Sequence, residues 1–252
     1  MKKIVFFLML IASLVSCGQE EPVAAELGLD VDQMKLLEET FKGFVRGGAN
    51  LSDEDKETFS KISEELSLAS LQFSKNVLDA TNAYTLHVTD SADLAGLPEY
   101  VKAMGAETAK EKGLEGWAFT LAYPSFGPFM KYSENRELRR QMWPAHNSKG
   151  IGGDFDNNEL VKKIVDLRIK KANILGYETF ADYALEVRMA KDRNTVNEFI
   201  KSLLEPSIPF AKKDVKDVED YAKANGFTDK IMPWDFSYWS ERLQKEQYSL
   251  NE

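Results

Sequence analysis

The feature that most constrains the fold is a long apolar stripe between residues 52 and 82. Apolar side chains recur there in steps of three and four residues, at Phe59, Ile62, Leu66, Ala69, Phe73 and Val77. Such steps place side chains on one face of an α-helix. Ser52 stands before three acidic residues, which is typical of a helix start because a hydroxyl caps the first turn and carboxylates favour the positive end of the helix dipole. The sequence therefore predicts one amphipathic helix from Ser52 to Asn82.

Similar spacing predicts helices over most of the chain from residue 30 onward. Two segments differ, AYTLHVTD and GWAFTLAY, in which β-branched and aromatic residues nearly alternate, so they are expected to form two short strands. Pro144 predicts a kink in its helix, and Pro206 and Pro209 predict a bent pair of helices. The predicted fold class is mainly α, a multi-helix lobe with a small two-stranded β element.

The charge of the chain argues against a nucleic-acid partner. Lysine and arginine total 32 against 41 acidic residues, a net charge of −9. Nucleic-acid binding draws its affinity from clustered basic side chains, so we expect no such partner.

The first residues have the pattern of a bacterial export signal. Two lysines precede an apolar run from Ile4 to Val15, followed by LVSC, and Cys17 is the single cysteine of the chain. The pattern predicts a signal peptide over 1–16, a lipidated Cys17, an acidic tether over 17–29 and a main region over 30–252. The expected location is the bacterial cell envelope, in the periplasm or the outer membrane, with the membrane reached through Cys17. The alternative is an ordinary signal peptide that contains a cysteine by chance.

Side chains that carry chemistry are few. His87 and His146 are the two histidines, and neither is followed by the Glu and second His of a zinc-peptidase helix. No Gly-x-Ser-x-Gly nucleophile motif occurs either. From the residues alone we therefore predict no catalytic and no metal-binding residue.

The C-terminal stretch MPWDFSYWSERLQKEQYSLNE has the spacing of a helix with an aromatic face. That face is formed by Trp234, Tyr238, Trp239 and Leu243, and no Gly or Pro stop signal follows it. We expect the chain to stop before the segment against which this face would pack. These four residues would then form an interface with a missing lobe. Such an open apolar face would promote association.

Several blocks carry a family resemblance. FVRGGANLS, PSFGPFMKYSENRELRRQMW, DNNELVKKIVDLRIKKANILGYETFADYAL and PWDFSYWSERL occur in this order. Together they resemble the helical part of the peptidyl-dipeptidases of the oligopeptidase A and thimet oligopeptidase family, from Asp30 to the end.

The resemblance implies a helical zinc metallopeptidase that releases dipeptides from short peptides. In that family a His-Glu-x-x-His helix and a later Glu hold the zinc, and this motif lies beyond the Pro-Trp-Asp block. None of these ligands maps onto the present sequence, so the hypothesis is a helical, non-catalytic part of a lipid-anchored peptidase, without zinc and inactive by itself. The alternatives are a tethered module that binds short peptides or another protein, and a piece that joins a separate catalytic lobe.

Overall fold

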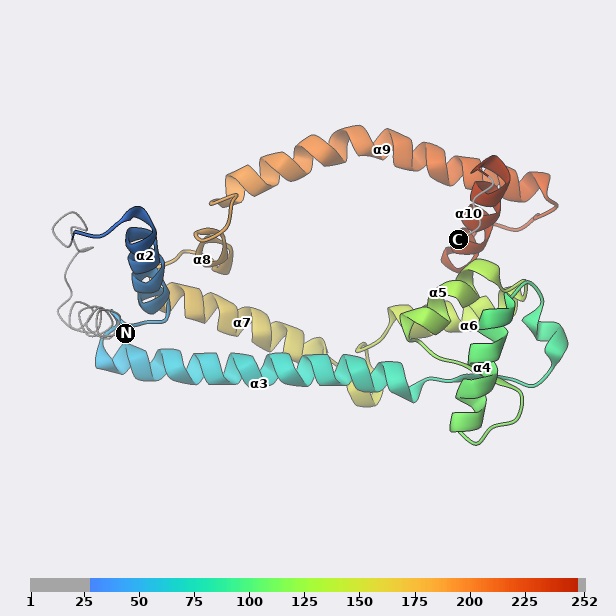
Figure 1. The fold of residues 1–252 in the computed structure, drawn as a ribbon, viewed down its shortest axis with the longest axis horizontal. Helices are drawn as coiled ribbons and strands as arrows, with labels where there is room; N and C mark the ends of the chain where they lie inside the picture. The colour runs from blue at the N-terminus through green and yellow to red at the C-terminus, as the bar shows by residue number, and fades with distance from the viewer. Residues whose placement is uncertain (1–27, 249–252) are drawn as a thin grey trace. The chain divides into compact units, whose positions relative to one another are not determined.

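The computed structural model describes residues 28–248, which form helices and one small sheet. The helices are α2 (Val31–Arg46), α3 (Asp53–Ala83), α4 (Glu99–Glu111), α5 (Tyr123–Tyr132), α6 (Arg136–Asn147), α7 (Asn158–Ile174), α8 (Phe180–Leu185), α9 (Arg193–Ala224) and α10 (Pro233–Tyr248) (Figure 1). Strands β1 (Leu86–Val88) and β2 (Trp117–Phe119) pair antiparallel, with His87 opposite Ala118. The predicted fold class, mainly α with a two-stranded β element, is confirmed.

The described chain divides into two compact units, each made of two separate stretches. Unit 1 contains residues 28–70 and 162–195, and unit 2 contains residues 71–161 and 196–252, of which residues 71–161 and 196–248 are described. Helices α3, α7 and α9 therefore each begin in one unit and continue into the other.

Helix α3 begins as the sequence predicts. The Ser52 hydroxyl accepts a hydrogen bond from the Asp55 backbone N–H at 3.1 Å and donates one to the Asp55 carboxylate at 2.8 Å. The apolar stripe is buried or half-buried along the helix, and Ala69 is its most buried member, at 4% exposed. The prediction of one long helix here is confirmed.

One group of polar contacts in unit 1 centres on Arg46, the last residue of α2. The Arg46 guanidinium forms an ion pair with Glu186 and lies 4.0 Å above the ring of Tyr183. The Tyr177 hydroxyl donates a hydrogen bond to the same carboxylate at 2.6 Å. Arg46 thus joins the end of α2 to the segments on either side of α8.

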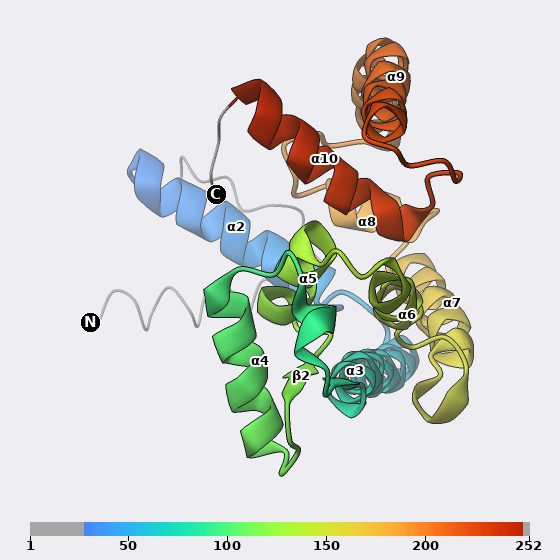
Figure 2. The same cartoon turned by 90° about the vertical axis from the view of Figure 1, so that its right-hand side faces the viewer.

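Unit 2 contains two apolar cores. The larger core forms around the sheet. Helix α4 packs against β2, and helices α5 and α6 complete this core (Figure 2). Its buried members are Leu86, Val88, Leu94, Leu97, Val101, Phe119, Leu121, Phe129, Met130 and Met142. Gly105 of α4 lies so close to Phe119 that an added Cβ would come within 2.9 Å of the ring, so glycine permits this approach of helix to strand.

One prediction based on proline is corrected. Pro206 and Pro209 lie within the single helix α9, where a bent pair of helices was expected. Helix α6 contains Pro144 and ends at Asn147, and the kink expected there stays a prediction. Proline leaves the carbonyl four residues earlier without its N–H donor. Residues 201–210 of α9 are all exposed, so water can satisfy the carbonyls freed there, and the helix need not break.

Candidate functional site

The two histidines lie in different structural settings. His87 is exposed on β1, and its Nε2 lies 2.6 Å from the Glu115 carbonyl oxygen. The ring of His146, on α6, stacks on Phe126 with 3.9 Å between the centroids. Burial, assisted by the positive charge of Lys149, lowers the pKa of His146 below its usual value. Each ring therefore has a local structural contact, and neither points to catalysis.

The aromatic face predicted at the C-terminus turns inward in unit 2. Tyr238 and Trp239 are 8% and 9% exposed and form the second core with Val218 and Ala222 of α9. Trp234 packs edge-on against Trp143 at 6.5 Å. Tyr238 and Trp239 are therefore covered within unit 2, contrary to the expected open face, whereas the predicted interface of α10 with a missing lobe stays a prediction.

Asp235 joins α10 to α6 through buried charges. Its carboxylate is fully buried and accepts hydrogen bonds from the guanidinium of Arg136 at two nitrogens, both at 2.9 Å. It also accepts one from Arg139 at 3.1 Å and one from the Met232 backbone N–H at 3.1 Å. The remaining donors of Arg139 reach the carbonyls of Ser133 and Trp234, at 2.6 and 3.0 Å. This cluster is satisfied internally, so we assign it a role in positioning α10.

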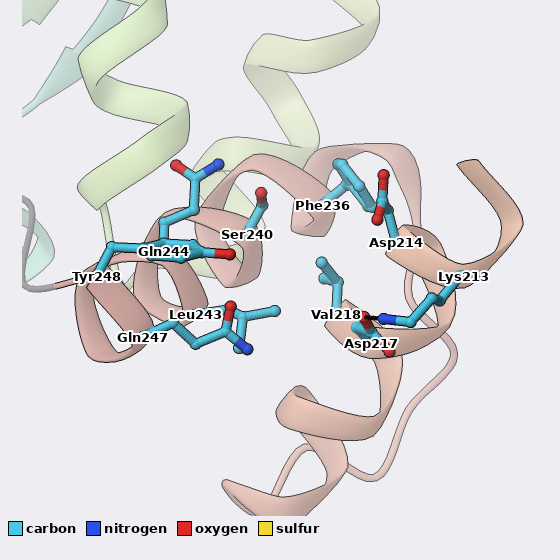
Figure 3. Close-up of a pocket in the computed structure, with 10 residues that line it drawn as sticks. All are labelled: Lys213, Asp214, Asp217, Val218, Phe236, Ser240, Leu243, Gln244, Gln247 and Tyr248. Atoms are coloured by element: carbon cyan, nitrogen blue, oxygen red, sulfur yellow. Dashed lines mark hydrogen bonds and ion pairs between the residues drawn. The ribbon is translucent and has the colours of Figure 1, made fainter. Parts of the chain in front are cut away.

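A groove lies between the C-terminal part of α9 and α10, within unit 2. Its volume is about 670 Å³, within the range of small-ligand sites. Figure 3 shows Leu243 of α10 pointing toward Val218 of α9. Leu243 is the one residue of the predicted aromatic interface that lines the groove. The other lining residues are Lys213, Asp214, Asp217, Phe236, Ser240, Gln244, Gln247 and Tyr248.

The charged side chains of the groove are unequally paired. Lys213 forms an ion pair with Asp217 one turn further on, and this hydrogen bond raises the pKa of the lysine. Asp214 makes no ion pair or hydrogen bond within residues 28–248. Lys213 also attracts Asp214, so the two aspartates and one lysine of the lining leave the groove with a net charge of −1. Sequence reasoning missed this site because its residues lie on two helices whose pairing no local pattern specifies.

Comparison with known proteins places this arrangement in a family. Residues 129–252 match the model of Peptidase family M3. The chain is 34% identical to oligopeptidase A of Escherichia coli over 229 residues, and 33% identical to oligopeptidase A of Haemophilus influenzae over 227 residues. The chain belongs to peptidase family M3. These matches cover 89% and 88% of the chain but 34% and 33% of the relatives, so the chain spans about a third of the length of the curated relatives it matches.

The M3 relatives correct the predicted localisation. One Arabidopsis thaliana relative, 35% identical over 87% of the chain and 32% of its own length, is named a probable cytosolic oligopeptidase A. This finding contradicts the expected lipid-anchored protein of the cell envelope, and we withdraw that prediction. Cys17 and the segments 1–16 and 17–27 lie outside the described residues. No helix between residues 28 and 248 is long and apolar enough to cross a membrane.

The residues of the described M3 region do not fit a zinc ion. Between residues 28 and 248 no three side chains of His, Cys, Asp or Glu come together as a metal-binding group. Zinc sites in proteins use at least three such ligands. Residues 28–248 therefore contain no set of ligands that could hold the zinc ion on which the family depends.

Proposed function

We propose that residues 30–252 form a helical, non-catalytic part of an M3 metallopeptidase of the dipeptide-releasing type, and that this polypeptide does not hydrolyse peptides by itself. The family match over residues 129–252 carries the proposal. A relative in Escherichia coli named dipeptidyl carboxypeptidase is 28% identical over 90% of the chain and 34% of its own length, which supports the dipeptide-releasing type.

The proposed inactivity rests on chemistry. Metal-dependent peptide hydrolysis needs an ion that polarises the carbonyl and lowers the pKa of water. The described residues offer no group of ligands for that ion, and both histidines have local contacts instead.

Metal content and cleavage test this proposal together. The purified chain is incubated with zinc, dialysed and analysed for metal, and then assayed with a blocked tetrapeptide beside Escherichia coli oligopeptidase A as the active control. We expect less than about 0.1 zinc per chain and no cleavage. One tightly held zinc per chain, or cleavage that a chelator abolishes, would refute the proposal.

A second candidate function is association with a separate catalytic lobe, and an exposed face of α9 favours it. Large apolar side chains recur on one side of this helix and are 43 to 68% exposed: Phe199, Ile200, Leu203, Leu204, Ile208, Phe210 and Val215. We call these seven residues the α9 apolar face. At helical spacing this face continues to Val218 and Ala222, which α10 covers. Contiguous exposed apolar patches commonly mark interaction sites.

A mixing experiment tests the association. The added polypeptide carries the part of Escherichia coli oligopeptidase A that the chain does not match, and co-sedimentation and peptide cleavage are measured. Leu203→Ser is expected to weaken co-sedimentation at least about fivefold, because a buried leucine contributes roughly 1.5–3 kcal/mol. Glu205→Ser, two residues away on the opposite side of α9, is the control and should change little. Equal effects of both variants would exclude this face as the contact.

A further inference from the structure

The groove between α9 and α10 combines three kinds of recognition chemistry. Val218 and Leu243 supply an apolar floor. The side chains of Ser240, Gln244 and Gln247 make no hydrogen bond to another side chain or to the backbone within the described residues. Amide side chains carry both a donor and an acceptor, and so can pair with the two groups of a peptide bond.

The electrostatics of the groove select the ligand further. Asp214 faces the groove from α9 and makes no ion pair or hydrogen bond within residues 28–248, although it attracts Lys213, which is paired with Asp217 (Figure 3). An unpaired carboxylate attracts a cation. A metal ion does not fit, because the described residues bring no three metal-ligating groups together. A ligand that carries an amino group next to an apolar side chain can pair with the Asp214 carboxylate and also contact the apolar floor.

We propose that this groove binds the amino-terminal end of a short apolar peptide. The ligand's free α-amino group pairs with Asp214, its main chain runs past Gln244 and Gln247, and an apolar side chain lies on the floor that Leu243 forms over Val218. This inference deepens the proposed function. It rests on that proposal for one assumption, that the ligand is a peptide. It needs no catalysis by the chain.

Two matched peptides test the role of the charge. Leu-Ala-Leu-Ala amide with a free amino group is compared with its N-acetylated form, in which a neutral amide replaces the charged amine. Binding to the full chain is measured by isothermal titration calorimetry at low salt. We expect the free amine to bind about 3- to 5-fold more tightly, the range of an exposed ion pair. Asp214→Asn should remove the difference, and the control Asp166→Asn, on exposed α7, should retain it. Equal affinity of the two peptides for the unmodified chain would overturn the proposal.

The amide side chains provide a second, independent test. The double variant Gln244→Ala, Gln247→Ala should weaken binding of both peptides about tenfold, because it removes two ligand hydrogen bonds. Gln141→Ala, an exposed glutamine of α6, is its control. Circular dichroism checks that each variant retains the helix content of the parent. If the folded double variant binds the peptides as tightly as the parent, the peptides do not bind in this groove and the proposal is wrong. The zinc and cleavage assays on the unmodified chain test the proposed function, whereas the peptide titrations test the groove. A failure of one proposal can therefore be told from a failure of the other.

Discussion

Replacing Asp235 with alanine should strongly destabilise unit 2. The change removes a fully buried carboxylate that accepts four hydrogen bonds, three from the guanidinium groups of Arg136 and Arg139 and one from the Met232 N–H. Arg139 is only 2% exposed, and burial already lowers its pKa. Asp235→Ala therefore leaves a buried positive charge without its counter-charge.

The expected cost is about 3–5 kcal/mol, the usual penalty for removing one partner of a buried ion pair. With a urea slope of roughly 2 kcal/mol/M, the unfolding midpoint should fall by about 1.5–2.5 M. Tryptophan fluorescence is a suitable probe because Trp234 and Trp239 lie on the same helix as the change.

Asp229→Ala is the matched control for this prediction. Asp229 pairs with the same Arg136 at 2.6 Å, but its side chain is 65% exposed. Exposed pairs contribute about 0–1 kcal/mol, so the midpoint should move by less than about 0.5 M. If Asp235→Ala is as mild as the control, Asp235 is not what fixes α10 to α6.

Two further predictions concern pH and glycine. Because the pKa of His146 is lowered in the folded chain, the unfolded state binds its proton more readily, so stability should fall as the pH drops from above the usual histidine pKa toward the lowered one. His146→Gln should reduce this loss in urea titrations at pH 7.5 and 5.0, and an unchanged pH dependence would contradict the argument. Gly43 lies within α2 with open space around an added Cβ, so Gly43→Ala should stabilise by about 0.5–1 kcal/mol. Gly96 has φ of +83°, and an added Cβ would clash with the Tyr132 carbonyl oxygen, so Gly96→Ala should lower the thermal midpoint. Changes of the same sign for the two variants would contradict the argument.

The elements predicted best from the sequence are those determined by local signals. The stripe from Phe59 to Val77 and the Ser52 cap specify α3 without reference to any other part of the chain. Gly176, with φ of +86°, follows α7 as a helix stop should. Capping and periodicity act within a few residues, so both can be read from one sequence.

Predictions that depended on a distant partner were less secure. The spacing of Tyr238 and Trp239 was correct for a helix, but it could not reveal that Val218 and Ala222 cover them. Asp235 gave no local sign of its role, because both arginines that bind it lie almost a hundred residues earlier. Periodicity identifies an apolar face and leaves its partner undetermined.

The division of the chain into two interleaved units limits how it can be dissected. Each unit needs an early and a late stretch of sequence, so no single cut releases either unit whole. Unit 2 would have to be produced as residues 71–161 joined to 196–252 by a linker. During synthesis on a ribosome, the core between α9 and α10 cannot form until the last described helix has emerged. Shortening the chain from its C-terminus should thus expose Val218 and Ala222, and it should also uncover the part of the core around the sheet on which Trp234 packs.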